Sequence, residues 1–313
     1  SIFAQTYENW EICVADGSPM GKSCERVLRR YADRDDRVKY LILGENKGIS
    51  GNTNAAMDMA SGDFILLADH DDTLTPNALY EVAKAINADP LNDVIYSDED
   101  KLDMDGGALF EPHFKPDFDP DLLTSTNYIC HLFAVNRDLV EEVGQFDERF
   151  DGAQDYDFIF RCTEKARKIY HIPKVLYHWR CHQGSTASNP ESKLYAFEAG
   201  ARAIKAHFDR LGIETESIEK GVDYGKYHVR FAIHGEPLVS VIIPNKDHTA
   251  DLDVCVRSLM EKATYKNLEY IIIENNSTEP ATFEYYEKLQ RDHENVKVVT
   301  WEREFNYSAI NNF

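Results

Sequence analysis

Short apolar runs alternate along the chain with longer stretches whose apolar residues stand three and four positions apart. The short runs favour buried strands, and the longer stretches favour helices. We expect strands at residues 10–14, 38–43, 64–67, 93–97, 133–135 and 171–179. We expect helices at residues 24–31, 51–60, 78–88 and 195–211, one more after Asp138, and one with the acidic cluster of GQFDERFDGAQDYDFIFRC. This alternation is typical of an α/β protein with a mostly parallel sheet and helices on both faces.

The pattern starts again near Pro237. ATYKNLEYIIIENNS, from Ala263, is similar to QTYENWEICVADGS, from Gln5, and the segments that follow the two copies also match. An internal repeat of this kind predicts that the end of the chain repeats the architecture of its beginning. The apolar run PLVSVIIPNK precedes the second copy and has no counterpart before the first.

We therefore expect three regions in the chain. Residues 1–213 form a domain that lacks its first strand, residues 214–236 form a connector, and residues 237–313 form the first part of a second, truncated domain. A sheet with a missing strand exposes backbone groups and apolar surface. One hypothesis is that PLVSVIIP fills this gap, from the same chain or from a neighbouring copy, which would lead to self-association through the incomplete sheet.

The amino-acid composition of the chain excludes some classes of binding partner. With 43% hydrophobic and 12% aromatic residues, the chain can bury a core. Its formal net charge of −21 argues against a nucleic-acid partner, which would need a basic patch. No run reaches the roughly 20 apolar residues of a transmembrane segment. The six cysteines are dispersed without a CxxC pair, so we expect reduced thiols in a cytoplasmic protein.

Candidate chemistry is concentrated in the acidic stretch FILLADHDDTLTP, which starts at Phe64. Asp69 and Asp71 follow a buried strand, and alternate residues of an extended chain point the same way. Two such carboxylates suit a hard divalent cation that also binds phosphate oxygens. The alternative is a charged turn after a core strand.

Four motifs carry a family resemblance when they are taken in order. QTYENWEICVADGSP, ENKGISGNTNAAMDMASGDFILLADHDDTLTP, GAQDYDFIFR and YHWRCHQGSTA resemble family 2 glycosyltransferases, which are inverting, nucleotide-sugar-dependent enzymes with a Rossmann-like GT-A fold. YSDEDKLD, FKPDF and NYICHLFAV resemble the bacterial members that build O-antigen and other surface polysaccharides, often with tandem domains. The resemblance covers residues 1 to about 190 and resumes at Pro237.

The resemblance implies a nucleotide-diphosphate sugar donor and a glycan or lipid-linked glycan acceptor. A cytoplasmic enzyme with such an acceptor could associate peripherally with the inner face of the membrane. Asp16 matches the acid that contacts the nucleotide base, and Asn46, Gly48 and Asn54 match the segment on the nucleotide side. Each of these residues could equally serve as a turn or capping residue.

The resemblance also implies a cofactor, Mn²⁺ or Mg²⁺. Asp71 is the expected metal ligand, and Asp69 is expected to contact the metal and the ribose-diphosphate, while Asp72 is not assigned. A divalent ion can neutralise the diphosphate leaving group as the glycosidic bond breaks.

A polar loop near the end of the first domain is expected to close over the diphosphate. In this loop, Arg180 and Ser185 match donor-binding residues, and His182 could ligate the metal. A polar surface loop is the alternative. Tyr128 and His131 lie where acceptor or sugar contacts are expected.

Asp155 matches the general base, the carboxylate that takes a proton from the acceptor hydroxyl. Asp157 competes for this role, but on a helix it points about 200° around from Asp155, so only one of them should face the site. Both could instead be first-turn acids that the helix dipole favours.

Two other functions remain open. The chain could be an inert truncated fragment that binds carbohydrate or serves in assembly. It could also be a sugar nucleotidyltransferase, which would need a Gly-rich, basic segment near its first strand, and the sequence shows none there.

Overall fold

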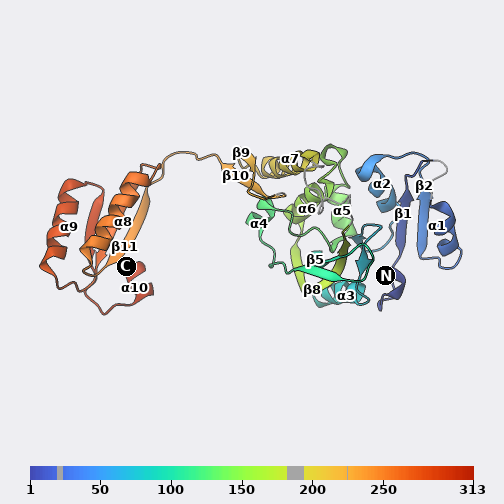
Figure 1. The fold of residues 1–313 in the computed structure, drawn as a ribbon, viewed down its shortest axis with the longest axis horizontal. Helices are drawn as coiled ribbons and strands as arrows, with labels where there is room; N and C mark the ends of the chain where they lie inside the picture. Colours follow the sequence, from blue (N-terminus) through green and yellow to red (C-terminus); the bar gives the residue numbers. More distant parts are fainter. Residues whose placement is uncertain (20–23, 182–193, 224) are drawn as a thin grey trace. The chain divides into compact units, whose positions relative to one another are not determined.

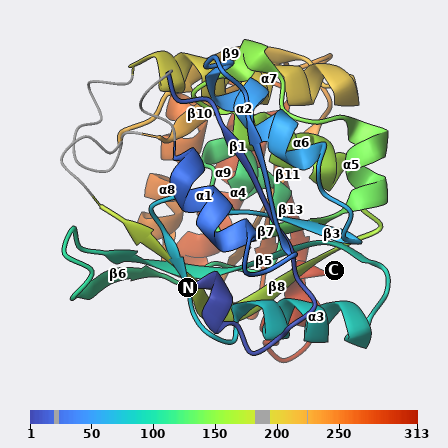
Figure 2. The ribbon, with the colours of Figure 1, turned by 90° about the vertical axis from the view of Figure 1, so that its right-hand side faces the viewer.

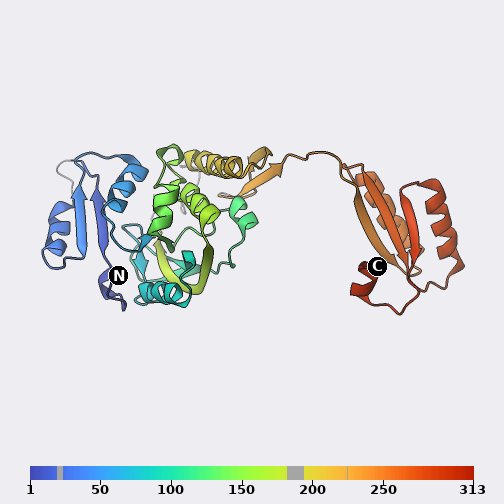
Figure 3. The same ribbon diagram turned by 180° about the vertical axis from the view of Figure 1, so that it is seen from behind.

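The computed structural model describes residues 1–19, 24–181, 194–223 and 225–313. The chain divides into two compact units, Ser1–Ala232 and Ile233–Phe313, and each is described by itself (Figures 1 and 3). No described helix has both the length and the apolar character that crossing a membrane requires. All six cysteines are free thiols.

The first unit begins with the 3₁₀ turn η1 (Ile2–Ala4) and a parallel pair of strands, β1 (Ile12–Asp16) and β2 (Val38–Ile42). Helix α1 (Glu25–Ala32) packs on β2, and α2 (Gly48–Met57) packs on β1. Among the described strands, β1 pairs with β2 alone, so the two form a sheet of their own.

The largest sheet of the first unit has six strands, in the order β3-β7-β5-β8-β4, with β6 added on β5. Within it, β5 and β8 run parallel and the other pairs are antiparallel, so this sheet is mixed rather than mostly parallel. The strands are β3 (Phe64–Leu67), β4 (Thr73–Leu74), β5 (Asn92–Leu102), β6 (Leu109–His113), β7 (Phe133–Asn136) and β8 (Lys168–Arg180).

Helices cover both faces of this sheet (Figures 1 and 2), as the sequence predicts. Side chains alternate along a strand, so Val94 and Tyr96 of β5 pack toward α6 while Ile95 packs toward α3. The helical elements of the unit are α3 (Ala78–Ala88), α4 (Pro120–Ser125), α5 (Arg137–Val143), η2 (Glu148–Phe150), α6 (Gln154–Lys165) and α7 (Leu194–Leu211).

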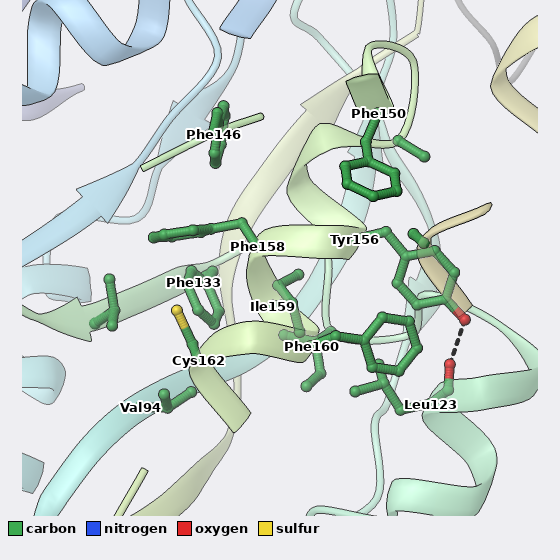
Figure 4. Close-up of a cluster of buried hydrophobic side chains, with 14 of the residues drawn as sticks. Val94, Leu123, Phe133, Phe146, Phe150, Tyr156, Phe158, Ile159, Phe160 and Cys162 are labelled. Carbon is green, nitrogen blue, oxygen red and sulfur yellow. Dashed lines mark hydrogen bonds between the residues drawn. The ribbon is translucent and has the colours of Figure 1, made fainter. Parts of the chain in front are cut away.

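Helix α6 lies at the centre of the main core (Figure 4). Phe158 packs edge-on against Phe133 of β7, with ring centroids 6.1 Å apart. The Tyr156 hydroxyl donates a hydrogen bond to the Leu123 carbonyl of α4. Buried on nearly every side, α6 holds its first turn in a fixed position beside the sheet.

Local polar residues set where helices begin. Asp119 accepts a hydrogen bond from the Leu122 amide at 2.9 Å, and Pro120 occupies the first turn of α4. The cap of α5 is Asn136, which accepts from the Asp138 amide at 2.8 Å. Asp138 therefore lies in the first turn, where the helix dipole favours an acid, and the helix is capped two residues earlier than the sequence predicts.

The stretch expected as a connector contains an antiparallel pair, β9 (Thr215–Lys220) and β10 (Tyr227–Phe231). Tyr227 stacks on Phe197 of α7 with centroids 4.8 Å apart, so this pair packs on the first unit. Most residues of these strands are exposed or half-buried, and no clear apolar run signals them in the sequence.

The second unit has a parallel sheet in the order β11-β12-β13. Its elements are β11 (Val239–Asn245), α8 (Thr249–Lys262), β12 (Leu268–Glu274), α9 (Pro280–Asp292), β13 (Val296–Thr300) and α10 (Tyr307–Asn311). Ile12 pairs with Val38 in the first unit and Tyr270 with Val296 in the second, at the same separation along the chain.

Strand β11 carries the segment PLVSVIIP and pairs with β12 throughout, from Val239 opposite Leu268 to Asn245 opposite Glu274. Within this chain, the segment thus pairs with its own unit, whereas self-association through a neighbouring copy stays a prediction. The backbone of the segment pairs with the next strand along the chain, as short βαβ units favour.

Candidate active site

Three ligand-bearing side chains converge at the end of β3. Asp69 and Asp72 lie in the turn between β3 and β4, and His131 directly precedes β7. One atom of each lies within 4.8 Å of the others, and His131 Nε2 is 3.8 Å from Asp69 Oδ2. Because β3 and β7 are antiparallel neighbours, the end of one strand meets the start of the other.

Strand β8 fixes the acidic turn. The Tyr177 hydroxyl donates to Asp72 Oδ2 at 2.6 Å and accepts from the Asp69 amide at 3.1 Å. The Arg180 amide donates to Asp72 Oδ1 at 2.7 Å. Burial raises the pKa of Asp72, although these two donors act in the opposite direction. Both Asp72 oxygens are thus occupied in holding the turn.

His131 lies between the acidic turn and the aromatic end of β8. Its ring stacks on Tyr177, with centroids 4.7 Å apart, and meets the edge of Trp179 at 6.3 Å. Its Nδ1 atom is buried and has no hydrogen-bond partner in the part of the chain that the structure describes. The stacked ring therefore holds Nε2 toward Asp69.

The cluster fits a divalent cation. Carboxylates are the ligands that Mg²⁺ and Mn²⁺ prefer, and an imidazole nitrogen can complete such a set. The orphaned polar atom of His131 indicates a ring held by packing rather than by a hydrogen bond of its own. The grouping contains Asp69, as expected, together with Asp72 and His131, whereas the expected ligand His182 lies outside the described residues.

Asp155 lies in the first turn of α6, near His131. Its Oδ2 accepts a hydrogen bond from Asn127 Nδ2 at 2.9 Å. Burial raises the pKa of Asp155, and the nearby His131 lowers it in part. Asn127 Oδ1 in turn accepts from the Cys130 amide at 3.2 Å. Residues 127–131, which we call the site loop, thus contact both Asp155 and Asp69.

Asp157 points into the protein instead. Its side chain is 1% exposed and forms ion pairs with Arg161 at 2.8 Å and Arg210 at 3.5 Å. These contacts join α6 to α7 and to the end of α5, because Arg161 also donates to the Val143 carbonyl. The geometry gives Asp157 a structural role.

Replacing Asp157 with asparagine should lower the free energy of unfolding by about 2 kcal/mol, because two guanidinium groups lose a buried carboxylate. Urea unfolding followed by circular dichroism measures this change. Glu142→Gln, at an exposed position of α5, is the matched control and should have little effect. Equal stability of the two variants would contradict the assigned role.

The residues expected on the nucleotide side have local partners. Asp16 ends β1 and accepts from the Ser18 amide at 2.9 Å and the Cys24 amide at 2.7 Å. Asn54 exchanges two hydrogen bonds with the backbone of Phe146, at 2.8 and 2.9 Å. These contacts close a turn and join α2 to the loop after α5. Asp16 and Asp69 lie at the ends of strands that belong to different sheets.

Asn46 and Gly48 shape the start of α2. Asn46 Oδ1 accepts from the Gly48 amide at 3.0 Å. Gly48 has a φ of +79°, in the left-handed region that favours glycine, and an added Cβ would lie 3.1 Å from Asp151. The identity of Gly48 is explained by the backbone alone.

The second unit offers a comparison for Asp16. Glu274 occupies the matching place at the end of β12 and is 4% exposed. It accepts hydrogen bonds from the Ser277 amide at 2.7 Å and the Tyr286 hydroxyl at 2.9 Å. In both units, the acid at this strand end closes the following turn.

The Arg180 side chain forms hydrogen bonds with backbone carbonyl groups. Its Nε donates to the Asp71 carbonyl at 2.7 Å, and its Nη1 donates to the Asp103 carbonyl at 3.3 Å. It therefore ties the acidic turn to the β5–β6 connection. Ser185 lies outside the described residues, as does the rest of the loop expected to close over a diphosphate.

A cleft of about 290 Å³ lies next to the cluster. Trp179, whose ring edge meets His131, is one of its walls. The other lining residues come from β5 and the β6 hairpin and are Glu99, Asp100, Lys101, Glu111 and His113. The aromatic wall and the surrounding polar groups suit a polar ligand with one apolar face.

Comparison with known proteins identifies the family. The model of the family "Glycosyl transferase family 2" matches residues 1–144 and 240–312. An uncharacterized protein of Sinorhizobium fredii is 43% identical over the whole chain, which spans 34% of that protein. The O-antigen biosynthesis protein RfbC of Myxococcus xanthus is 37% identical over the whole chain, which spans 24% of that protein. The chain thus covers about a third or less of the length of these relatives.

A solved structure shows the same fold. The crystal structure of S. aureus TarS 1–349 in complex with UDP matches with a TM-score of 0.51 and 18% identity, over 66% of this chain and 59% of that one. The likeness confirms the α/β fold of GT-A type. Together with the family match over most of the sequence, it shows that the chain belongs to glycosyl transferase family 2.

Proposed function

We propose that residues 1–213 carry the catalytic site of an inverting, metal-dependent glycosyltransferase. The site would move a sugar from a nucleotide-diphosphate sugar to a glycan or lipid-linked glycan in the synthesis of a bacterial surface polysaccharide. The observation that carries this proposal is the site loop, which contacts Asp155 on one side and the cluster of Asp69, Asp72 and His131 on the other. The O-antigen relative supports the pathway.

Asp155 is the proposed general base. A carboxylate that takes the acceptor proton lets the hydroxyl oxygen attack the anomeric carbon from the face opposite the diphosphate, which inverts the configuration. The Asn127 amide, by donating to Oδ2, orients the carboxylate. The acceptor sugar would occupy the cleft beside Trp179, whose ring contacts His131 of the site loop.

The cluster is the proposed metal site. A bound Mn²⁺ or Mg²⁺ would neutralise charge on the diphosphate leaving group. Asp69 is common to the motif-based and the geometric ligand sets, whereas Asp71 is assigned by the motif and His131 by geometry. In a chain with a formal net charge of −21, such an ion would also offset repulsion between the site and the donor.

The remaining donor contacts are proposed from the motifs. Asp16 would contact the base, and Arg180 would approach the diphosphate if it exchanged a backbone carbonyl for a phosphate oxygen. The other residues proposed to bind the donor or metal are Asn46, Gly48, Asn54, His182 and Ser185. We place the reaction on the cytoplasmic side, where a protein at the inner membrane face meets nucleotide sugars and lipid-linked glycans.

A thermal-shift panel of UDP-, GDP- and dTDP-sugars, each with Mn²⁺ or with EDTA, tests the function. We expect one nucleotide class to raise the melting temperature by about 5 °C in Mn²⁺ at a hundredfold excess over its Kd, because ligand that binds only the folded state stabilises it. EDTA should abolish the shift. If no nucleotide sugar in the panel changed the melting temperature, the result would favour an inert fragment that binds carbohydrate or serves in assembly.

A further inference from the structure

The acidic run Asp98–Asp100 of β5 belongs neither to the metal cluster nor to the proposed general base, although Glu99 and Asp100 also line the cleft beside Trp179. All three side chains are buried, at 3%, 8% and 8% exposed, although carboxylates are rarely buried without partners. Each meets a basic side chain from another element. The pairs are Asp98 with His171, Glu99 with Lys115, and Asp100 with His178.

Lys115 is the central cation of this group. Its side chain is fully buried, and its Nζ lies 3.4 Å from Glu99 Oε2. The same Nζ donates hydrogen bonds to the Ile129 carbonyl, at 2.7 Å, and to the His131 carbonyl. Two of the three donors of this ammonium group thus bind backbone carbonyls, and Glu99 supplies the opposite charge beside it.

Both carbonyls belong to the site loop, which contains neither a helix nor a ladder strand of its own. A loop without regular hydrogen bonding depends on side chains to satisfy its backbone. Its two ends carry Asn127, which contacts Asp155, and His131, which faces Asp69. Lys115 is thus bonded to the backbone that sets the direction of both groups.

We propose that Lys115 is a positioning residue, whose ammonium group, held by Glu99, fixes the site loop so that Asn127 stays on Asp155 and His131 stays on Asp69. The proposal rests on the proposed function for its catalytic consequence, but its structural part concerns this loop alone. Lys115 touches neither the donor nor the metal in this scheme. It acts through the two carbonyls it holds.

The charge of Glu99 must be considered in any variant. Lys115→Met preserves an apolar stem but leaves the buried Glu99 with only the half-exposed His113 as a basic partner, which is destabilising. The double variant E99Q/K115M removes both charges together. It should therefore retain more stability than K115M while still leaving the two loop carbonyls without the ammonium donor.

The experiment compares the full-length wild type, K115M and E99Q/K115M by hydrogen–deuterium exchange, with Mn²⁺ titration and transfer measured in parallel. In the folded double variant, we expect amides 127–131 to exchange about tenfold faster and Mn²⁺ to bind about tenfold more weakly. Loss of the hydrogen bond from Asn127 should also raise the pKa of Asp155 further. In a plot of the transfer rate against pH, the fall on the acidic side should therefore move to higher pH.

Lys168→Met is the matched control, because Lys168 pairs with Asp89 at 2.8 Å near the start of β8. It should leave all three readouts unchanged. Wild-type exchange of the site loop in E99Q/K115M would overturn the proposal. If exchange rises but the wild type binds neither Mn²⁺ nor a nucleotide sugar, the loop assignment stands and the proposed function fails.

Discussion

Replacing Asp155 with asparagine should lower the rate of sugar transfer about a thousandfold and leave donor binding unchanged. Asparagine has nearly the same shape as aspartate and can still meet Asn127 after its amide rotates, so the loop should remain in place. It cannot accept the proton of the acceptor hydroxyl. The loss should therefore appear in kcat, while the donor Kd stays at the wild-type value.

Asp157→Asn is the matched control, because it makes the same change two residues further along α6. Its carboxylate is directed to Arg161 and Arg210, so the folded variant should transfer sugar at close to the wild-type rate. Single-turnover kinetics with saturating donor measure both variants. Near-normal turnover by Asp155→Asn would move the general base to another residue.

The surroundings of Asp155 also set the pH at which it can act. Burial raises its pKa above the ordinary aspartate value of about 3.9, and His131 offsets part of that rise. The base works only when it is deprotonated. As the pH is lowered, transfer activity should consequently start to fall at a higher pH than it would with an exposed aspartate as the base. The affinity for the donor should not show this fall.

The sequence was sufficient to predict the buried elements and the acids that follow them. The apolar runs before Asp69 and around Val94 predict β3 and β5, and the end of β3 places Asp69 in the cluster with Asp72 and His131. Strands with exposed faces, such as β6 and β10, carry no comparable pattern because solvent rather than a core selects their side chains.

The histidine of the cluster could not be predicted from spacing. His131 reaches Asp69 only because β7 runs antiparallel to β3, whereas an alternating pattern of strands and helices favours parallel neighbours. Its neighbour Asp72 was left unassigned because nothing in the motif reveals the hydrogen bonds from Tyr177 and Arg180. Contacts between distant segments decide these roles.

Asp69→Asn should weaken Mn²⁺-dependent binding of the nucleoside diphosphate found in the panel by about a hundredfold. Loss of even an outer-sphere partner of a metal ligand costs about 10–100-fold in affinity, and Asp69 is the one residue shared by the motif-based and geometric ligand sets. Calorimetry with Mn²⁺ and with EDTA measures the effect. In EDTA, the variant and the wild type should bind equally weakly, because no ion is present to be held.

Two further substitutions assign the second carboxylate. Both oxygens of Asp72 already accept hydrogen bonds from β8, so Asp72→Asn should mainly lower stability, while Asp71→Asn should weaken Mn²⁺-dependent binding more. Asp138→Asn, at an exposed position in α5, controls for the loss of a negative charge. Unchanged Mn²⁺-dependent affinity in Asp69→Asn would show that the ion binds without this carboxylate and would remove Asp69 from the metal site.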